Sequence, residues 1–221
     1  MNEAPKRESE SAYEKLVELL LDGTITENQA LSERNLSERL GFGRTPIREA
    51  VRDLVREGVL ESHPTRGTLL RPLTLSDLHD LYELRFAIEG MAASLAAQRG
   101  PVEELAPFEE AFERTLEHSD FDVLRVHDHG VEFHKEVMRL SGNKRLIEMY
   151  APFRLRFRIP FGIVRNRTPE RVRASVREHL GILQALMQRD ADLARQLMCD
   201  HLKVGLEFRT EMLLHRQRYG I

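Results

Sequence analysis

The chain has 221 residues, of which 41% are hydrophobic and 31% charged, and its formal net charge is −3. This size and composition suit a globular protein with one large domain or two small ones. No apolar run approaches the roughly 20 residues that span a bilayer, and Met1–Glu10 is too polar for a signal peptide. The single cysteine, Cys199, excludes an internal disulfide framework and fits a reducing compartment. We therefore expect a soluble, cytoplasmic protein without a membrane partner.

Arginines concentrate in one part of the chain although the total charge is negative. Between residues 34 and 71 there are eight arginines and five acidic residues, which gives a local charge of +3. Arginine suits phosphates and guanine edges better than lysine does, because its planar guanidinium donates parallel hydrogen bonds. This segment is therefore the first candidate for contact with nucleic acid.

The N-terminal part of the chain begins with a polar stretch and two helical patterns. Residues 1–11 are expected to form a flexible tail. Apolar residues between Tyr13 and Leu21 recur at the spacing of a helix. A shorter helix is predicted over residues 32–41, where Gly41 ends it.

A third helix and a hairpin complete this part of the chain. Thr45 is the expected N-cap of the third helix, and Pro46 is its expected first residue. Residues 59–62 and 68–70 predict two short strands joined by a glycine-containing turn. Helix, helix, turn, helix and hairpin is the order of a winged helix-turn-helix, which we place at residues 12–72.

The rest of the chain has the periodicity of helices. After a linker at residues 73–75, helical spacing continues over residues 76–218, and it predicts an all-α bundle of six or seven helices. The fold class is therefore mainly α, with the winged helix-turn-helix in front. The predicted breaks between helices fall at Gly100–Pro101, His118–Asp120, Gly142, residues 160–168 and Arg189–Asp190.

One segment of the helical region has a different pattern. Residues 153–159 alternate strictly between apolar and polar, which is typical of a strand. A single strand would have no partner in a helical domain, so we predict a helix there. Pro152 predicts a kink or a break just before it.

Contact with DNA is predicted for one end of the third helix, for an arginine of the preceding helix and for the hairpin turn. A recognition helix enters the major groove with its N-terminal residues against base edges and phosphates. Alternatively, each arginine is a solvated side chain that pairs with Glu38, Glu49 or Asp53. The spacing of the whole set favours DNA contact by Arg34, Arg44, Thr45, Arg48, Arg66 and Gly67.

Three histidines lie on the apolar stripes of three different predicted helices. They are His134, His179 and His201. Neutral imidazoles that meet in a bundle core are suitable ligands for zinc or another divalent transition ion. A single histidine on an apolar face is more often a hydrogen-bonded core residue, and that alternative stays open for each of the three.

Arg85 lies inside an otherwise apolar stripe and therefore needs an anionic partner. Glu89, one helical turn further on, is the ordinary choice. The other choice is a carboxylate ligand that binds the guanidinium in a cavity of the domain. Arg154 and Arg158 are one turn apart if their segment is helical, and they either add to such an anion site or lie at the surface.

The stretch from Leu31 to Val51, continuing through Gly58 and Arg66-Gly67, resembles the DNA-binding domain of the GntR family. Its core, "GRTPIREAV", is highly specific. The resemblance implies that the residues matching Arg34, Arg44, Thr45, Arg48 and Gly67 contact operator DNA. Gly43 departs from the family pattern, which usually has serine or threonine there, and this departure removes a possible phosphate contact or capping bond.

The segments "LYELRFAIEGMAASLAA", "EFHKEVMRLSGNKRLIEM" and "REHLGILQALMQRDADLARQLMCDHL" resemble the FCD-type domain of the FadR subfamily. This resemblance implies a bundle that holds a divalent metal, zinc or nickel, through three histidines and one Asp or Asn. A small carboxylic acid binds at or beside such a metal. The histidines match His134, His179 and His201, and the arginine matches Arg85.

The acidic metal ligand of the subfamily has no counterpart here. Relatives place Asp or Asn four residues before the first histidine, and this chain has Gly130. Asp128, His129 and Glu132 are near in sequence but project from other helix faces. The site therefore holds metal with three histidines plus water or ligand, or binds it weakly, or has lost it.

Together these patterns predict a transcriptional regulator, more specifically a repressor, that binds a palindromic operator as a homodimer and senses a small carboxylate. A metal-dependent hydrolase is the alternative, because a three-histidine site with an open position can activate water. Neither an H-E-x-x-H pair nor a G-x-S-x-G elbow is present, so we do not expect an enzyme. A DNA-binding structural protein without an effector is the third possibility.

Overall fold

The computed structural model describes residues 3–26, 29–159 and 168–219. The chain separates into two compact units. The first comprises Met1–Leu73 and Pro152–Ile163, and the second comprises Thr74–Ala151 and Val164–Ile221. None of the helices in the described part has the length together with the apolar composition of a membrane-spanning helix.

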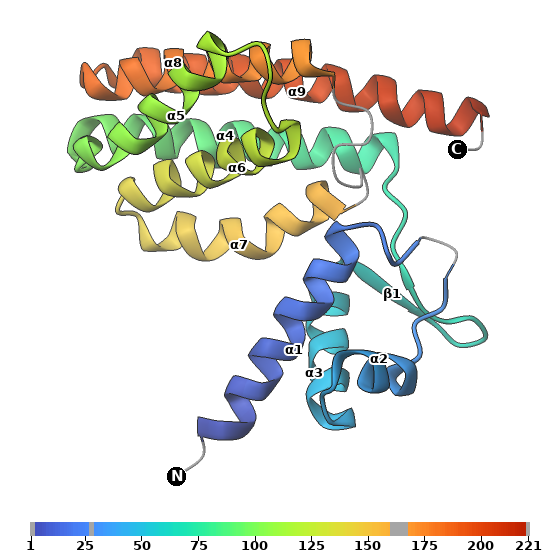
Figure 1. Cartoon of the computed structure of the whole chain (residues 1–221). Helices are drawn as coiled ribbons and strands as arrows, with labels where there is room; N and C mark the ends of the chain where they lie inside the picture. The colour runs from blue at the N-terminus through green and yellow to red at the C-terminus, as the bar shows by residue number, and fades with distance from the viewer. Residues whose placement is uncertain (1–2, 27–28, 160–167, 220–221) are drawn as a thin grey trace. The chain divides into compact units, whose positions relative to one another are not determined.

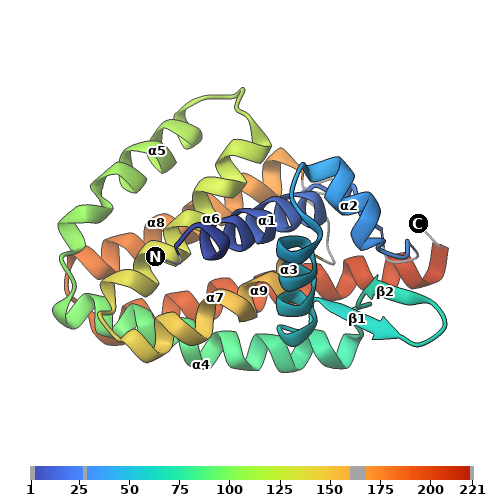
Figure 2. The ribbon, with the colours of Figure 1, turned by 90° about the horizontal axis from the view of Figure 1, so that it is seen from below.

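The first unit contains three helices of the N-terminal region and a two-stranded antiparallel hairpin (Figures 1 and 2). Strand residue Leu60 pairs with Leu70, and His63 pairs with Gly67. This is the predicted winged helix-turn-helix. Its elements are α1 (Glu3–Leu21), α2 (Glu33–Leu40), α3 (Arg44–Arg56), β1 (Leu60–His63) and β2 (Gly67–Leu70).

Helix α1 begins earlier than the sequence predicts. It starts at Glu3, so the residues expected to form a flexible tail are helical from that residue on. The reason is local, because this stretch is rich in Glu, Lys, Arg and Ala, which have good helix propensity without needing an apolar face. Among the side chains described in this helix, the first buried one is that of Ala12, which belongs to the apolar core of the unit.

Helix α3 also begins earlier than predicted. It starts at Arg44 and its N-cap is Gly43, so the prediction of Thr45 as N-cap is wrong. Thr45 and Pro46 instead lie in the first turn. Proline is compatible with that turn because the first four N–H groups of a helix have no partner within the helix.

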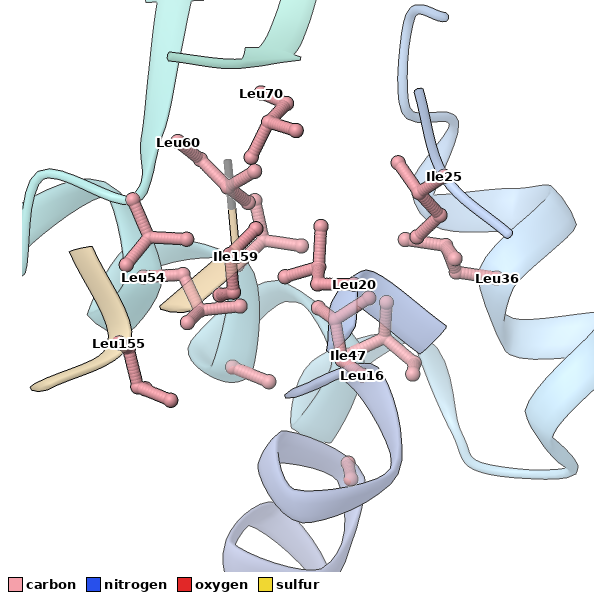
Figure 3. Packing of buried hydrophobic residues seen from close by; sticks show 14 residues of the cluster. Leu16, Leu20, Ile25, Leu36, Ile47, Leu54, Leu60, Leu70, Leu155 and Ile159 are labelled. Carbon is pink, nitrogen blue, oxygen red and sulfur yellow. The ribbon is translucent and has the colours of Figure 1, made fainter. Parts of the chain in front are cut away.

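The first unit has a continuous apolar core of fourteen buried residues. α1 contributes Leu16 and Leu20, α3 contributes Ile47 and Leu54, and the hairpin contributes Leu60 and Leu70. The same cluster includes Leu155 and Ile159, which come from a helix far along the chain (Figure 3).

The second unit is an all-helical bundle in its described part. Helix α4 packs along α9 and also against α6 and α8, and α5 packs on α8 (Figure 1). Thr74 and Asp77 form a capping box that starts α4. The elements are α4 (Leu75–Arg99), the 3₁₀ helix η1 (Val102–Leu105), α5 (Ala106–Glu117), α6 (Val123–Leu140), α7 (Lys144–Arg158), α8 (Pro169–Met187) and α9 (Ala191–Tyr219).

Most of the predicted breaks coincide with helix ends, but Pro152 does not. Helix α7 passes from Lys144 to Arg158 without a break, so the strand-like segment is helical as predicted. The predicted break at residues 160–168 falls largely outside the described residues. The division between the two units lies within α7, between Ala151 and Pro152.

Candidate functional site

The side chains predicted to contact DNA are all exposed on the first unit. Four of them are arginines, on α2, on α3 and in the hairpin turn. Their exposure leaves them available to a large partner, whereas the apolar side of α3 is buried in the core. The exposed set is Arg34, Arg44, Thr45, Arg48, Arg66 and Gly67.

The N-terminal end of α3 is open to a phosphate. Gly43 has no side chain to cap the first N–H groups, and no side-chain hydrogen bond is made there. Arg44 and Arg48 form no ion pair with any described residue. Arg34 pairs with Glu38 at 3.0 Å, but its side chain keeps 72% of its surface exposed. Such an exposed pair is easily exchanged for a phosphate contact.

The hairpin turn presents one further arginine. Arg66 lies in the turn, with its Nη2 3.4 Å from His63 Nε2. Gly67 opens β2 with φ of 77°, a left-handed conformation that a side chain would strain. The turn therefore holds Arg66 exposed at the tip of the wing.

The three predicted histidines meet in the second unit. His134 comes from α6, His179 from α8 and His201 from α9. The Nε2 atom of His134 lies 3.1 Å from that of His179 and 3.2 Å from that of His201. The Nε2 atoms of His179 and His201 are 3.3 Å apart. His134 and His179 are buried and His201 is nearly so. We call these three residues the histidine cluster.

Two carboxylates hold the outer nitrogens of the histidine cluster. Glu89 Oε2 accepts from His134 Nδ1 at 2.6 Å, and Glu178 Oε2 accepts from His201 Nδ1 at 2.6 Å. Glu89 also pairs with Arg85 and Glu178 with Arg171, at 2.6 Å and 2.9 Å. These bonds fix the ring orientation and place the proton on Nδ1, so the Nε2 lone pairs of His134 and His201 point inward.

Burial and neighbouring charges determine the protonation of these groups. Burial alone would raise the pKa of Glu89, but Arg85 and His134 outweigh it and lower this pKa to about 2. Burial also lowers the pKa of His179 and of His201 well below the ordinary histidine value, and the neighbouring imidazoles lower both further. The carboxylate is thus charged, and these two histidines are neutral and able to act as ligands.

The histidine cluster fits a metal ion. Three ligand nitrogens at about 2.0–2.1 Å from a tetrahedral zinc lie about 3.3–3.4 Å from one another. The observed separations of 3.1 Å to 3.3 Å are close to this value. Without a cation, at least two inward lone pairs face each other in a buried space, which is unfavourable. The Nδ1 atom of His179 is buried and has no hydrogen-bond partner among the described residues.

Gly130 leaves no room for the acidic ligand that the resemblance to the FCD-type domain implies at this position. A Cβ atom on Gly130 would lie 2.7 Å from Cε1 of His179, closer than real atoms approach. In this arrangement the imidazole takes the space of a side chain at position 130. Among the described residues the cluster therefore offers three nitrogen ligands, and position 130 adds no carboxylate.

Among the three arginines predicted for an anion site, the structure describes the side chain of Arg85. Arg85 is buried and its Nε donates to Glu89 Oε1, so the ordinary partner named from the sequence is present. The side chains of Arg154 and Arg158 lie outside the described residues, so their role in an anion site stays a prediction.

The sequence interpretation overlooked the two carboxylates as parts of the site. From the sequence, Glu89 is predicted only as a partner of Arg85, and no role is predicted for Glu178. The available signal was chemical, because a ligating histidine almost always donates its second N–H to a carboxylate or carbonyl. A search for acids on neighbouring apolar stripes would have found Glu89, whereas Glu178 requires knowing how α8 faces α9.

An exposed basic winged helix joined to a helical bundle with a buried histidine cluster defines a ligand-responsive transcriptional regulator. Residues 8–70 match the description "Bacterial regulatory proteins, gntR family", and residues 80–204 match the "FCD domain". The chain belongs to the gntR family of bacterial regulators and carries an FCD domain as its ligand-sensing part. FCD domains often bind metal.

Curated relatives agree with this family, and a solved structure shares the fold. The chain is 28% identical to the "Probable D-xylose utilization operon transcriptional repressor" of Paenarthrobacter nicotinovorans, covering 85% of this chain and 82% of the relative. It is also 28% identical to the "Glc operon transcriptional activator" of Escherichia coli strain K12, and the match covers 88% of this chain and 85% of that relative. The structure of "E. coli McbR/YncC" shares the fold, with a TM-score of 0.77, 21% identity and coverage of 93% and 98%.

These findings confirm the predicted fold class and the expectation that the chain is a transcriptional regulator and not an enzyme. The hydrolase alternative is therefore set aside.

Proposed function

We propose that this regulator binds a palindromic operator as a homodimer and represses transcription. In the proposal, a small carboxylic acid binds at a metal-loaded histidine cluster, and this binding changes the affinity of the regulator for DNA. The observation that carries the sensing part is the meeting of three Nε2 atoms within 3.1 Å to 3.3 Å of one another.

Zinc or nickel is the proposed metal because the donor set is three imidazole nitrogens. Imidazole suits both ions, and zinc with three protein ligands keeps an open position. The supporting carboxylates Glu89 and Glu178 raise the basicity of their histidines, as outer ligands do in known metal sites.

A carboxylic acid is the proposed effector because the open position favours an oxygen anion. When bound, the metal supplies a Lewis-acid position that a carboxylate oxygen can occupy. Gly130 provides no competing carboxylate. Arg85 keeps Glu89 charged and oriented, and we propose that its guanidinium adds to the positive field that an anion meets. Arg154 and Arg158 remain predictions for this role.

The DNA contacts are proposed for the end of α3 and the wing. Arg44, Thr45 and Arg48 would enter the major groove, while Arg34, Arg66 and Gly67 would contact the backbone or the adjacent groove. Two copies related by a two-fold axis would read two half-sites, which is why a palindromic operator and a homodimer are proposed together.

Repression is the proposed direction because it needs the fewest additional features. A bound dimer that covers a promoter blocks polymerase by its volume alone, whereas activation needs a surface that recruits polymerase. The names of the two relatives point in both directions, one to a repressor and one to an activator. A promoter fusion in the presence and absence of the protein measures this directly.

Thermal unfolding of the chelator-stripped full chain tests the sensing part. Zinc and nickel are added separately, each with and without a panel of small carboxylic acids. We expect metal to raise the midpoint, and one acid to raise it further only when metal is present. In His179→Ala both shifts should disappear, whereas the exposed His118→Ala serves as the matched control and should keep them.

The possible outcomes separate the parts of the proposal. A shift with acid alone would assign recognition to Arg85 and its surroundings and would reject the metal. No shift with any metal or acid would reject the whole sensing model and leave the DNA-binding assignment standing.

A further inference from the structure

The core of the DNA-binding unit contains two residues from outside the family-matched DNA-binding region. Leu155 and Ile159 are 5% and 3% exposed and belong to the same apolar cluster as the core residues of α1, α3 and the hairpin. The region matched to the gntR family ends at residue 70. Figure 3 shows Ile159 drawn between Leu54 of α3, Leu60 of β1 and Leu20 of α1.

A third residue of the same helix lies against the end of α3. A Cβ atom on Gly58 would lie 3.3 Å from Nε of Arg156. Gly58 follows the C-terminal end of α3 with φ of 73°, which favours glycine. Ile159 directly follows the last residue of α7 and lies four residues after Leu155 and three after Arg156, which is about one helical turn in each case.

A small hollow lies beside this contact. It is lined by Val59, Leu70, Leu155 and Ile159 together with their neighbours, and it holds about 10 Å³. This volume is at the lower limit of what one water molecule needs. Leu155 and Ile159 are themselves buried in the apolar core of the unit, so we expect the position of α3 to depend on the segment that carries them.

Helix α7 is continuous with the sensing unit. Its first half, as far as Ala151, belongs to that unit, and Tyr150 there is 5% exposed. Pro152 stands at the division and has no N–H to donate to the carbonyl one turn earlier, so the helix has one hydrogen bond fewer at this point. The two halves are thus joined by helix with a local weak point between them.

We propose that the second half of α7 is a positioning element for DNA binding: Leu155 and Ile159 hold α3 and the hairpin in the arrangement that engages DNA. The residues that touch DNA remain those of α3 and the wing, and α7 acts through them. The inference rests on the proposed function only in that α3 is the DNA-reading helix.

A regulatory consequence follows from the continuity of α7. The helix passes from Lys144 to Arg158 without a break, and its residues belong to both units. We therefore expect a zinc-dependent change in the sensing unit to reach α3 through the backbone of this helix.

The test compares variants of the full chain that are folded by circular dichroism at the assay temperature. In Leu155→Ala/Ile159→Ala we expect affinity for a duplex carrying the chain's own promoter region to fall about 10-fold or more. Zinc affinity of the histidine cluster should stay within about twofold, because the second unit keeps its own core. Met149→Ala is the matched control, since Met149 is on the same helix and is 57% exposed.

Milder variants keep the test decisive if the double variant does not fold. Leu155→Met and Ile159→Val retain most of the apolar volume and should recover most of the DNA affinity. The affinity change that zinc produces should shrink in the alanine variant, a result that a loss of stability alone would not give at a temperature where the protein is fully folded.

Hydrogen exchange gives a reading that does not depend on DNA. Amides of residues 44–58 should exchange at least about 10-fold faster in the alanine variant, while those of α8 keep their wild-type rates. Wild-type DNA affinity together with wild-type exchange in residues 44–58 would overturn the proposal. If the wild-type protein binds DNA equally well with and without zinc, the proposed metal sensing is rejected. The role of α7 is then decided by the DNA affinity and the hydrogen exchange of the alanine variant.

Discussion

Glu89 is the residue on which the buried polar network depends. It is 2% exposed and joins the guanidinium of Arg85 to the imidazole of His134. A buried ion pair contributes little net stability compared with apolar packing, but removal of one partner leaves a charge without compensation. The residue therefore serves to orient a ligand, and its loss should be costly to the fold.

Glu89→Gln tests this role. The amide keeps the size and can still accept from His134, but it removes the negative charge that faces the buried guanidinium of Arg85. We expect the free energy of unfolding to fall by about 3 kcal/mol or more, and zinc affinity to fall about 10–100-fold. Urea unfolding and zinc titration measure the two effects. Glu104→Gln, which removes an exposed partner of Arg139, should cost less than about 1 kcal/mol. Equal effects from the two substitutions would contradict the assignment.

The two glycines facing the bundle core should respond oppositely to alanine. At Gly130 the new Cβ would lie 2.7 Å from the buried His179 ring, whereas at Gly181 it would lie 3.8 Å from Leu197. Gly181→Ala should stabilise the protein by up to about 1 kcal/mol through helix propensity. Gly130→Ala should destabilise it by about 1–3 kcal/mol and weaken zinc binding, because the ring must move. Thermal unfolding with and without zinc compares the pair, and a stabilised Gly130→Ala protein would show that the ring is not fixed there.

Helix α3 has two ends with different expected roles. Arg44 and Arg48 lie toward its N-terminal end, and Arg56 lies at the other end, paired with Asp53. Recognition helices contact DNA mainly through their N-terminal residues.

Arg48→Ala should therefore weaken DNA binding by about 1–3 kcal/mol. Arg34→Ala should reduce the slope of log affinity against log salt concentration by about one, because one phosphate contact is lost. Arg56→Ala, the same change on the same helix, should leave both unchanged. Anisotropy titrations at several salt concentrations measure these values. An Arg56 effect as large as that of Arg48 would mean that the helix is oriented differently on DNA.

The elements of the chain could be predicted where their signals are local. Gly41, the C-cap of α2, and the glycine-containing hairpin turn act within a few residues, and each coincides with the structure. The predicted start of α3 differs from the observed one by two residues because Thr45 and Gly43 are both acceptable N-caps by sequence. The helix over 153–159 was predictable from the lack of a strand partner, but its packing into the other unit's core was not. That packing joins residues distant in sequence, and no local pattern reports it.

The candidate site was predictable to a similar degree. The apolar stripes placed His134, His179 and His201 on inward faces, and the structure brings their Nε2 atoms together. The pairing of Glu178 with His201 depends on how α8 and α9 meet. The exclusion of a side chain at Gly130 depends on the ring of a residue on another helix. Both are tertiary facts, and a single sequence carries no signal for them.

The stability of the whole metal-free protein should depend on pH through the histidine cluster. Burial, and then the neighbouring imidazoles, lower the pKa of His179 and His201 in the folded state. In the unfolded chain each takes up a proton below about pH 6.5, so the unfolded state binds more protons there and is favoured.

The free energy of unfolding should therefore fall as pH decreases below about 6.5, by up to about 1.4 kcal/mol per pH unit for each histidine. Urea midpoints between about pH 8 and 5.5 measure the slope, which should be shallower in His179→Gln. A protein that becomes more stable over this interval as pH falls would contradict the buried, neutral state of His179 and His201.

For the molecule as a whole, the question is whether the state of the histidine cluster controls DNA binding. The deciding measurement is the affinity of the full chain for a duplex of its own promoter region, taken metal-stripped, zinc-loaded and zinc-loaded with each acid of a panel. We predict that zinc with one acid changes this affinity at least about fivefold, and that His179→Ala abolishes the change while still binding DNA. Equal affinity in every state, with zinc shown to be bound, would contradict control of DNA binding by the cluster.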